Sequence, residues 1–183
     1  MRFQPKEAKI HLPTKKTGKF LGDKGNSNFK PTSEKALMKM REYGKETVKY
    51  KDGDPDFSPF TEHNTDFGML KCEVEIPHMT DQRKNPTWEG GRRPRGTSHD
   101  HNFDLGNFAQ ADNALLSKIH EINPDATIND IIKFRKDNEL IWHECPDGKT
   151  MQLVPVEIHS ACPHSGGVAE MKYRMAWGSY YIY

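Results

Sequence analysis

The stretch that decides the fold is Glu139-Leu-Ile-Trp-His-Glu-Cys-Pro-Asp-Gly-Lys-Thr-Met-Gln-Leu-Val-Pro-Val-Glu-Ile-His-Ser-Ala-Cys-Pro-His-Ser-Gly-Gly167. Residues 139–144 are typical of a strand, and the Pro-Asp-Gly sequence at 146–148 is typical of a hairpin turn. Residues 150–154 fit the returning strand. Pro155 suits the start of a helix that continues to about Ala161, since proline lacks the N–H that a first helical turn leaves unpaired. The stretch therefore predicts a strand, a tight turn, a second strand and a helix.

Three histidines accompany this hairpin and helix. His143 is expected on the first strand, His159 on the helix, and His164 after Pro163, where the helix has ended. A single strand histidine is more often packed or solvated than a metal ligand, but three of them around one hairpin favour a site. Neutral imidazole nitrogens suit transition metals, so two or three histidines favour Zn²⁺, Ni²⁺ or Mn²⁺ over a hard site made of oxygen ligands alone. We expect one divalent ion, with Zn²⁺, Ni²⁺, Mn²⁺ and Mg²⁺ as the candidates. The layout matches a ββα-metal unit. Glu144 adjoins His143, and alternate strand residues point to opposite faces. Both can serve one site only if the strand ends or kinks there.

The rest of the chain predicts an upstream scaffold of mixed strands and helices, so the fold class is α+β. Residues 1–30 are expected to form an irregular N-terminal arm, and residues 31–183 one domain whose ββα unit spans about 138–167. Apolar spacing predicts helices at 35–43, 108–122 and 128–136, with Ser33 and Thr127 as N-caps and Asp130 completing a capping box. Strands are expected at 48–50 and 70–76. Aromatic residues at both ends of Phe57-Ser-Pro-Phe60 indicate a pinned loop.

Composition limits the possible classes of protein. Only 34% of the 183 residues are hydrophobic, and 27 Lys and Arg against 26 Asp and Glu leave a net charge of +1. A surface that binds phosphate must therefore be a local patch. No apolar run approaches the roughly 20 residues of a membrane span, and we find no signal peptide in the first residues. The three cysteines form no CxxC pair, which excludes a four-cysteine zinc knuckle.

Residues 81–101 carry two further candidate features. Arg92, Arg93 and Arg95 form the densest basic cluster of the chain, in a glycine-rich stretch, and are our candidates for contacting nucleic acid. Solvated surface charge is the equally simple interpretation of this cluster. The triplet His99-Asp-His101 has metal-like spacing, but in a polar loop such a triplet is more often solvated.

The hairpin stretch resembles the C-terminal toxin nucleases of the HNH/endonuclease VII superfamily that carry a WHH-type motif. The resemblance rests on Trp142-His-Glu144, Asp147-Gly148, Thr150-Met-Gln-Leu-Val-Pro155, Ile158-His159 and His164-Ser-Gly-Gly167. Weaker similarity extends upstream to about Gly18. These domains occur at the C-terminal ends of bacterial polymorphic toxins, including contact-dependent inhibition proteins.

The resemblance implies a metal-dependent, nonspecific endonuclease that acts on DNA rather than RNA. It also implies a secreted or delivered effector that works in the cytoplasm of the target cell, and a cognate immunity protein. By position, His143 and His159 match metal ligands, and His164 matches a further ligand or a phosphate contact. Glu144 stands where the family often has a second histidine, the general base, and Gln152 where an asparagine orients that base.

Two questions stay open at the level of sequence. Glu144 could activate water, or it could bind the metal while His143 acts as the base. The function itself has alternatives: a noncatalytic, metal-stabilised module that binds nucleic acid or protein, or an RNase with the same site, because sequence does not reveal a preference for the 2′-OH.

Overall fold

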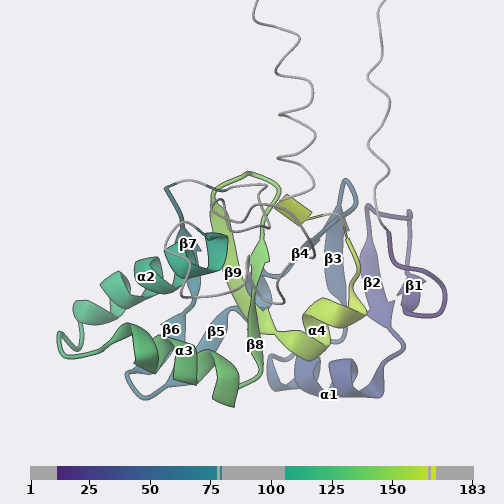
Figure 1. Ribbon diagram of the computed structural model, residues 1–183. Helices are drawn as coiled ribbons and strands as arrows, with labels where there is room; N and C mark the ends of the chain where they lie inside the picture. Colours follow the sequence, from purple (N-terminus) through teal and green to yellow (C-terminus); the bar gives the residue numbers. More distant parts are fainter. Residues whose placement is uncertain (1–11, 78, 80–105, 165, 168–183) are drawn as a thin grey trace, which may run out of the picture.

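The hairpin of strands β8 and β9 lies at the centre of the computed structural model, which describes residues 12–77, 79, 106–164 and 166–167 (Figure 1). Strand β8 (Leu140–Glu144) pairs antiparallel with β9 (Thr150–Pro155). Strand β7 (Glu73–Glu75) pairs with the other side of β9, so the sheet order is β7-β9-β8 and β8 is an edge strand. The predicted hairpin is confirmed, and within the described residues β8 has a strand partner on one side only.

Within the described residues, two further antiparallel sheets and four helices lie around the hairpin. The larger sheet has the order β1-β2-β3-β4, made of β1 (Gly18–Phe20), β2 (Asn28–Pro31), β3 (Val48–Lys51) and β4 (Asp54–Asp56). The smaller sheet pairs β5 (Glu62–Thr65) with β6 (Gly68–Lys71). The helices are α1 (Glu34–Glu42), α2 (Asn107–His120), α3 (Ile128–Asp137) and α4 (Val156–Ala161), with a 3-10 turn η1 (Ser58–Phe60) after β4. This mixed α+β architecture, with a hairpin followed directly by a helix, is consistent with a ββα-metal unit.

The hairpin separates two hydrophobic cores, and both of its faces are buried. Met151 and Leu153 of β9 pack with Trp142 of β8 into the core under α2 and α3. Val154 packs on the other side, with Phe57, the β1–β4 sheet, α1 and α4. Figure 1 shows α2 and α3 on one side of the hairpin and the β1–β4 sheet with α1 on the other. The site-bearing strands are therefore held between two packed layers.

Local signals in the sequence placed the helices correctly. Ser33 caps α1 by accepting a hydrogen bond from the backbone N–H of Ala36, at 3.3 Å. The Thr127 backbone N–H donates to the Asp130 carboxylate at 2.7 Å, which completes the predicted capping box of α3. In the turn of the hairpin, Gly148 has a φ of +78°, a left-handed conformation that favours glycine.

The structure differs from the sequence-based expectation in two places. Residues 18–30, expected within an irregular arm, contain β1 and most of β2, and these two strands pair with each other and bury Phe29 completely. These strands are too short and lysine-rich to give a clear periodic signal. The single strand expected at 70–76 is divided between β6 and β7. Cys72 lies between them, donating its N–H to Thr61 and accepting from the N–H of Leu153, so the chain passes here from one sheet to the next.

None of the helices in the described ranges is long and apolar enough to cross a membrane.

Candidate metal and catalytic site

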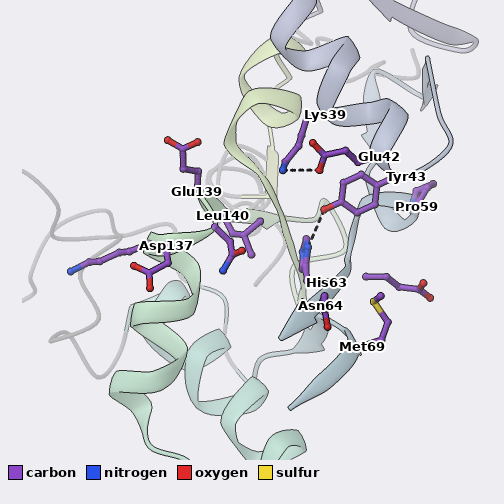
Figure 2. A pocket seen from close by; sticks show the side chains of 13 residues that line it. Lys39, Glu42, Tyr43, Pro59, His63, Asn64, Met69, Asp137, Glu139 and Leu140 are labelled. Atoms are coloured by element: carbon purple, nitrogen blue, oxygen red, sulfur yellow. Dashed lines mark hydrogen bonds and ion pairs between the residues drawn. The ribbon is translucent and has the colours of Figure 1, made fainter. Parts of the chain in front are cut away.

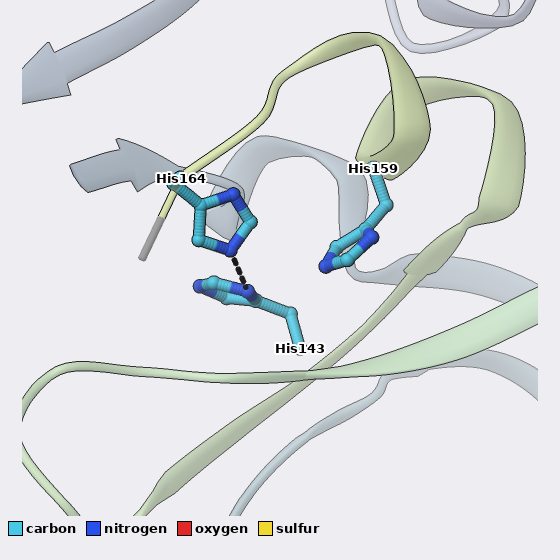
Figure 3. A group of neighbouring side chains, drawn as sticks. All are labelled: His143, His159 and His164. Atoms are coloured by element: carbon cyan, nitrogen blue, oxygen red, sulfur yellow. Dashed lines mark hydrogen bonds between the residues drawn. The ribbon is translucent and has the colours of Figure 1, made fainter. Parts of the chain in front are cut away.

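Three histidines from the hairpin, the helix and the loop after it converge on one point (Figure 3). Each of His143, His159 and His164 offers one ring nitrogen, and these nitrogens all lie within 4.8 Å of one another. His143 Nδ1 and His164 Nε2 are 3.0 Å apart, close to the separation of about 3.3 Å that two ligands of one tetrahedral Zn²⁺ ion have. The donor set and its spacing fit a divalent transition metal.

The hydrogen bond of Nδ1 decides the tautomer of the neutral His164 ring. Its Nδ1 lies 2.8 Å from the carbonyl oxygen of Cys162. A carbonyl only accepts hydrogen bonds, so Nδ1 must carry the proton. In the neutral ring Nε2 then carries the lone pair, so it can accept a hydrogen bond from His143 Nδ1, 3.0 Å away, or bind a metal ion. Backbone carbonyls orient histidine ligands in this way in many metal sites.

His143 is the most deeply buried of the three. It is 1% exposed, and its Nε2 has no hydrogen-bond partner within the described part of the chain. Burial holds the pKa of its imidazole well below the ordinary value of 6.5, and the nearby His164 and His159 lower this pKa further. The ring therefore stays neutral, which is the form that binds metal.

Glu144 lies beside the triad without belonging to it. Its Oε1 accepts a hydrogen bond of 2.7 Å from the side-chain amide of Asn107, the first residue of α2, and both side chains are buried. Strand β8 ends at Glu144. A pocket of about 340 Å³ is lined by Glu144 and by all three histidines. The sequence-level condition for a shared site, that the strand ends here, is met.

The loop after α4 passes very close to the hairpin. A Cβ atom on Gly167 would lie 2.3 Å from the carbonyl oxygen of Cys145 and 3.0 Å from that of Glu144. Both are backbone atoms of the hairpin and cannot swing aside. Only glycine allows the segment that carries His164 to approach β8 this closely.

We expect Gly167→Ala to separate His164 from His143. The clash should cost about 1–3 kcal/mol of stability and weaken metal binding, as measured by thermal unfolding and by titration with Zn²⁺. Gly44→Ala is the matched control, because Gly44 has a φ of +66° and no atom within 4 Å of the new Cβ. That variant should lose only about 1–2 kcal/mol of stability, because alanine is strained at this positive φ. It should keep its metal affinity. Equal metal affinity in the two variants would contradict the role of Gly167.

Of the remaining predicted site residues, the structure describes Gln152, which does not belong to the group of converging nitrogens. Gln152 lies directly opposite His143 in the hairpin, and its Nε2 donates to Glu73 at 2.8 Å. Its predicted role in orienting the base stays a prediction. Arg92, Arg93 and Arg95, and the triplet at 99–101, lie outside the described residues.

Comparison with known proteins supplies the decisive observation. A family model for the DNase/tRNase domain of colicin-like bacteriocins matches residues 47–166. The match includes all three histidines and covers 120 of the 183 residues. The chain belongs to this family. The searches of curated proteins and of solved structures gave no match.

The protein is thus a nuclease toxin domain of the colicin-like bacteriocin class. It is an enzyme that hydrolyses phosphodiester bonds, and its substrate is nucleic acid. The match begins at Thr47, immediately before β3, so it includes β3, β4 and η1 as well as the hairpin. The family match therefore covers these upstream segments as well as the unit that carries the histidines.

The nuclease domain has a second pocket, larger than the first, at the opposite end of β8 (Figure 2). It has a volume of about 850 Å³, is lined by Leu140 and by residues of α1, β5, β6 and α3, and contains His63. The Nε2–H of His63 donates to the carbonyl of Leu153 at 2.8 Å, and its Nδ1 accepts from the Tyr43 hydroxyl at 3.1 Å. His63 thereby joins β5 to the centre of the hairpin.

We expect His63 to make stability depend on pH. Burial lowers its pKa below 6.5, the hydrogen bond to Leu153 opposes this shift, and the Lys39 charge adds to it. Between the lowered pKa and 6.5 the unfolded chain binds a proton that the folded chain does not, so stability falls as the pH drops through this window. His63→Gln should flatten this slope by up to about 1.4 kcal/mol per pH unit. Urea unfolding of both proteins in EDTA between pH 5 and 7.5 measures how the free energy of unfolding depends on pH. Parallel pH dependences for wild type and variant would contradict the prediction.

Three elements of the site were not identified from sequence. The Asn107 amide carries no motif, because its partner Glu144 lies 37 residues away in sequence. The Cys162 carbonyl lies only two residues from His164, but every residue has a backbone carbonyl, so the residue type gives no signal. Phe57 was recognised as part of a pinned loop, but its contact with the histidines follows from tertiary packing alone.

Proposed function

We propose that the chain is a metal-dependent endonuclease of the ββα-metal (HNH) kind in which His143, His159 and His164 hold one divalent ion. The observation that carries this proposal is the convergence of their three nitrogens within 4.8 Å between hairpin and helix. An all-imidazole donor set favours Zn²⁺, Ni²⁺ or Mn²⁺ over Mg²⁺. When bound, the ion would polarise the scissile phosphate and stabilise charge on the leaving oxygen.

We assign the general base to Glu144. It lines the same pocket as the three histidines, yet it does not belong to their group of converging donor atoms. This favours the role of proton acceptor over that of metal ligand. The Asn107 amide donates to Oε1 and so holds the Glu144 carboxylate in a fixed orientation. Because His143 lies among the converging nitrogens, it is better placed to bind metal than to act as the base.

The substrate we propose is DNA, cleaved without sequence specificity. The family description covers both DNases and tRNases, so RNA is the second candidate. Arg92, Arg93 and Arg95 would contribute phosphate contacts, which carry no sequence information.

The biological setting that we infer is that of a WHH-type toxin effector. The family assignment supports a domain that is delivered into a target cell and is neutralised in the producing cell by an immunity protein. We infer a single nuclease domain with its ββα unit at about 138–167.

Glu144→Gln tests the assignment of the base. Glutamine keeps the size of the side chain and an oxygen that can accept from Asn107, but it cannot take a proton from water. We expect cleavage of supercoiled plasmid to fall about 10²–10⁴-fold, with Zn²⁺ or Ni²⁺ affinity retained. Loss of metal binding in this variant would instead make Glu144 a ligand. Parallel reactions with tRNA separate the two substrates, and cleavage of tRNA alone would overturn the choice of DNA.

A further inference from the structure

Phe57 contacts all three imidazoles of the site. Its ring centroid lies 4.9 Å from that of His143, 5.6 Å from that of His159 and 5.7 Å from that of His164. The ring meets His143 and His164 edge to face, at interplanar angles of 82° and 68°, and lies tilted against His159 at 35°. Such arrangements are the preferred ones for neighbouring rings. One side chain, 86 residues before His143 in the sequence, therefore packs against the complete triad.

Phe57 is itself held firmly. It is fully buried and precedes the η1 turn, in which the Phe60 N–H donates to the Phe57 carbonyl at 2.9 Å. The neighbouring Asp56 carboxylate accepts from the backbone N–H of Ser58 at 3.0 Å and from its hydroxyl at 2.6 Å. The Thr61 hydroxyl donates to the Ser58 carbonyl at 2.9 Å. These hydrogen bonds lock the turn, so the aromatic ring has a defined position before any ion binds.

This support matters most for His143, because this most deeply buried of the three rings makes few hydrogen bonds within the described residues. His143 Nε2 has no hydrogen-bond partner within the described residues, and its Nδ1 faces another potential ligand. Apart from the contact of Nδ1 with His164, packing fixes the orientation of this ring. Phe57 does not line the pocket in front of the triad, and it covers the imidazoles from behind. A ring without donors or acceptors excludes water from that side, whereas the pocket among the described residues lies on the side that Phe57 does not line.

We propose that Phe57 is a positioning residue of the metal site, which sets the orientation of the three imidazoles before the ion binds and thereby raises metal affinity. This inference rests on the proposed function, in which the triad holds a divalent ion. It also gives the η1 turn a role in the site, although no residue of that turn has a metal-binding side chain. Preorganised ligands lose less side-chain freedom on binding, and residues behind a metal's ligands commonly change its affinity about 10–100-fold.

Phe57→Leu tests the proposal, with Phe60→Leu as the matched control. Both phenylalanines are fully buried, lie in the same turn and pack in the same hydrophobic core. The ring contact described for Phe60 is with Tyr43, at 5.6 Å, and not with an imidazole. The two variants should therefore lose similar stability for reasons that have nothing to do with metal.

We expect Phe57→Leu to weaken Zn²⁺ and Ni²⁺ binding about 10-fold or more, measured by isothermal titration at fixed pH, and Phe60→Leu to leave it within about 3-fold of the wild type. The visible spectrum of bound Co²⁺ should change in Phe57→Leu alone. Phe57→Tyr, which keeps the ring, should retain most of the affinity. Equal affinities of Phe57→Leu and Phe60→Leu would overturn the positioning role while the metal site stands. Absence of binding to the wild type would overturn the metal site itself, and the two failures are thus distinguishable.

Discussion

His143→Ala is expected to abolish cleavage of DNA by this nuclease domain. The substitution removes one of three converging nitrogens and the partner of His164 at 3.0 Å. An ion stabilises the transition state of phosphodiester cleavage by several kcal/mol, and about 4 kcal/mol corresponds to about 10³-fold in rate. We therefore expect at least about 10³-fold slower nicking of supercoiled plasmid, together with loss of tight Zn²⁺ or Ni²⁺ binding.

A buried histidine elsewhere in the fold serves as the control. His63 is 6% exposed, comparable to His143, but it lies in the other pocket, at the opposite end of β8. His63→Gln should cleave DNA at close to the wild-type rate at pH 7.5. Circular dichroism and thermal unfolding of His143→Ala in EDTA will show whether the chain has kept its fold. Wild-type nicking by a folded His143→Ala protein would exclude the histidine site as the catalytic centre.

Asp112→Ala should lower the free energy of unfolding more than Gly167→Ala, Gly44→Ala or Asp137→Ala. Asp112 is fully buried in α2, where its carboxylate accepts from the Arg135 guanidinium of α3 and from the Trp142 indole of β8, both at 2.7 Å. Arg135 also lies over the ring of Phe108, with its Cζ 5.8 Å from the centroid. Removing the carboxylate would leave a buried guanidinium without its counter-charge, which costs about 3–5 kcal/mol. The melting temperature should fall by about 10 °C or more for a chain of this size.

The same substitution should also reduce activity, since Trp142 immediately precedes His143. Asp137→Ala is the control, because its ion pair with Lys133 is exposed to solvent and should contribute little to stability. The double variant Asp112→Leu/Arg135→Met removes both charges and should recover part of the stability lost by the single one. A loss in Asp112→Ala no greater than that in Asp137→Ala would show that the buried network does not support the fold.

The candidate site could be predicted in part because its residues are close in sequence. His143, His159 and His164 lie within 22 residues, and a strand, a turn and a helix with short connections leave few ways to arrange them. The turn residues and the helix caps give local signals with local causes. Gly167 could be seen as a stop signal, but its real constraint, the carbonyl of Cys145 at 2.3 Å from a Cβ, depends on how the loop returns to the hairpin.

Contacts between distant segments could not be predicted in the same way. Phe57 and Asn107 lie 86 and 36 residues before His143, and no periodicity records which side chain will pack against which. The short strands β1 and β2 were missed for a related reason. Their pairing is stabilised by the burial of Phe29 in a core shared with β3, α1 and α4, and not by any preference within the strands.

The sequence by itself determined the hairpin, the helix, their histidines and the membership of a nuclease family, because each depends on residue types at short spacing. Only the tertiary structure decided that Glu144 lines the same pocket as the histidines, that Asn107 holds its carboxylate and that Phe57 packs behind all three imidazoles. These contacts arise when two hydrophobic cores close on opposite faces of one hairpin. Burial acts through space, so it brings together side chains whose separation along the chain carries no signal.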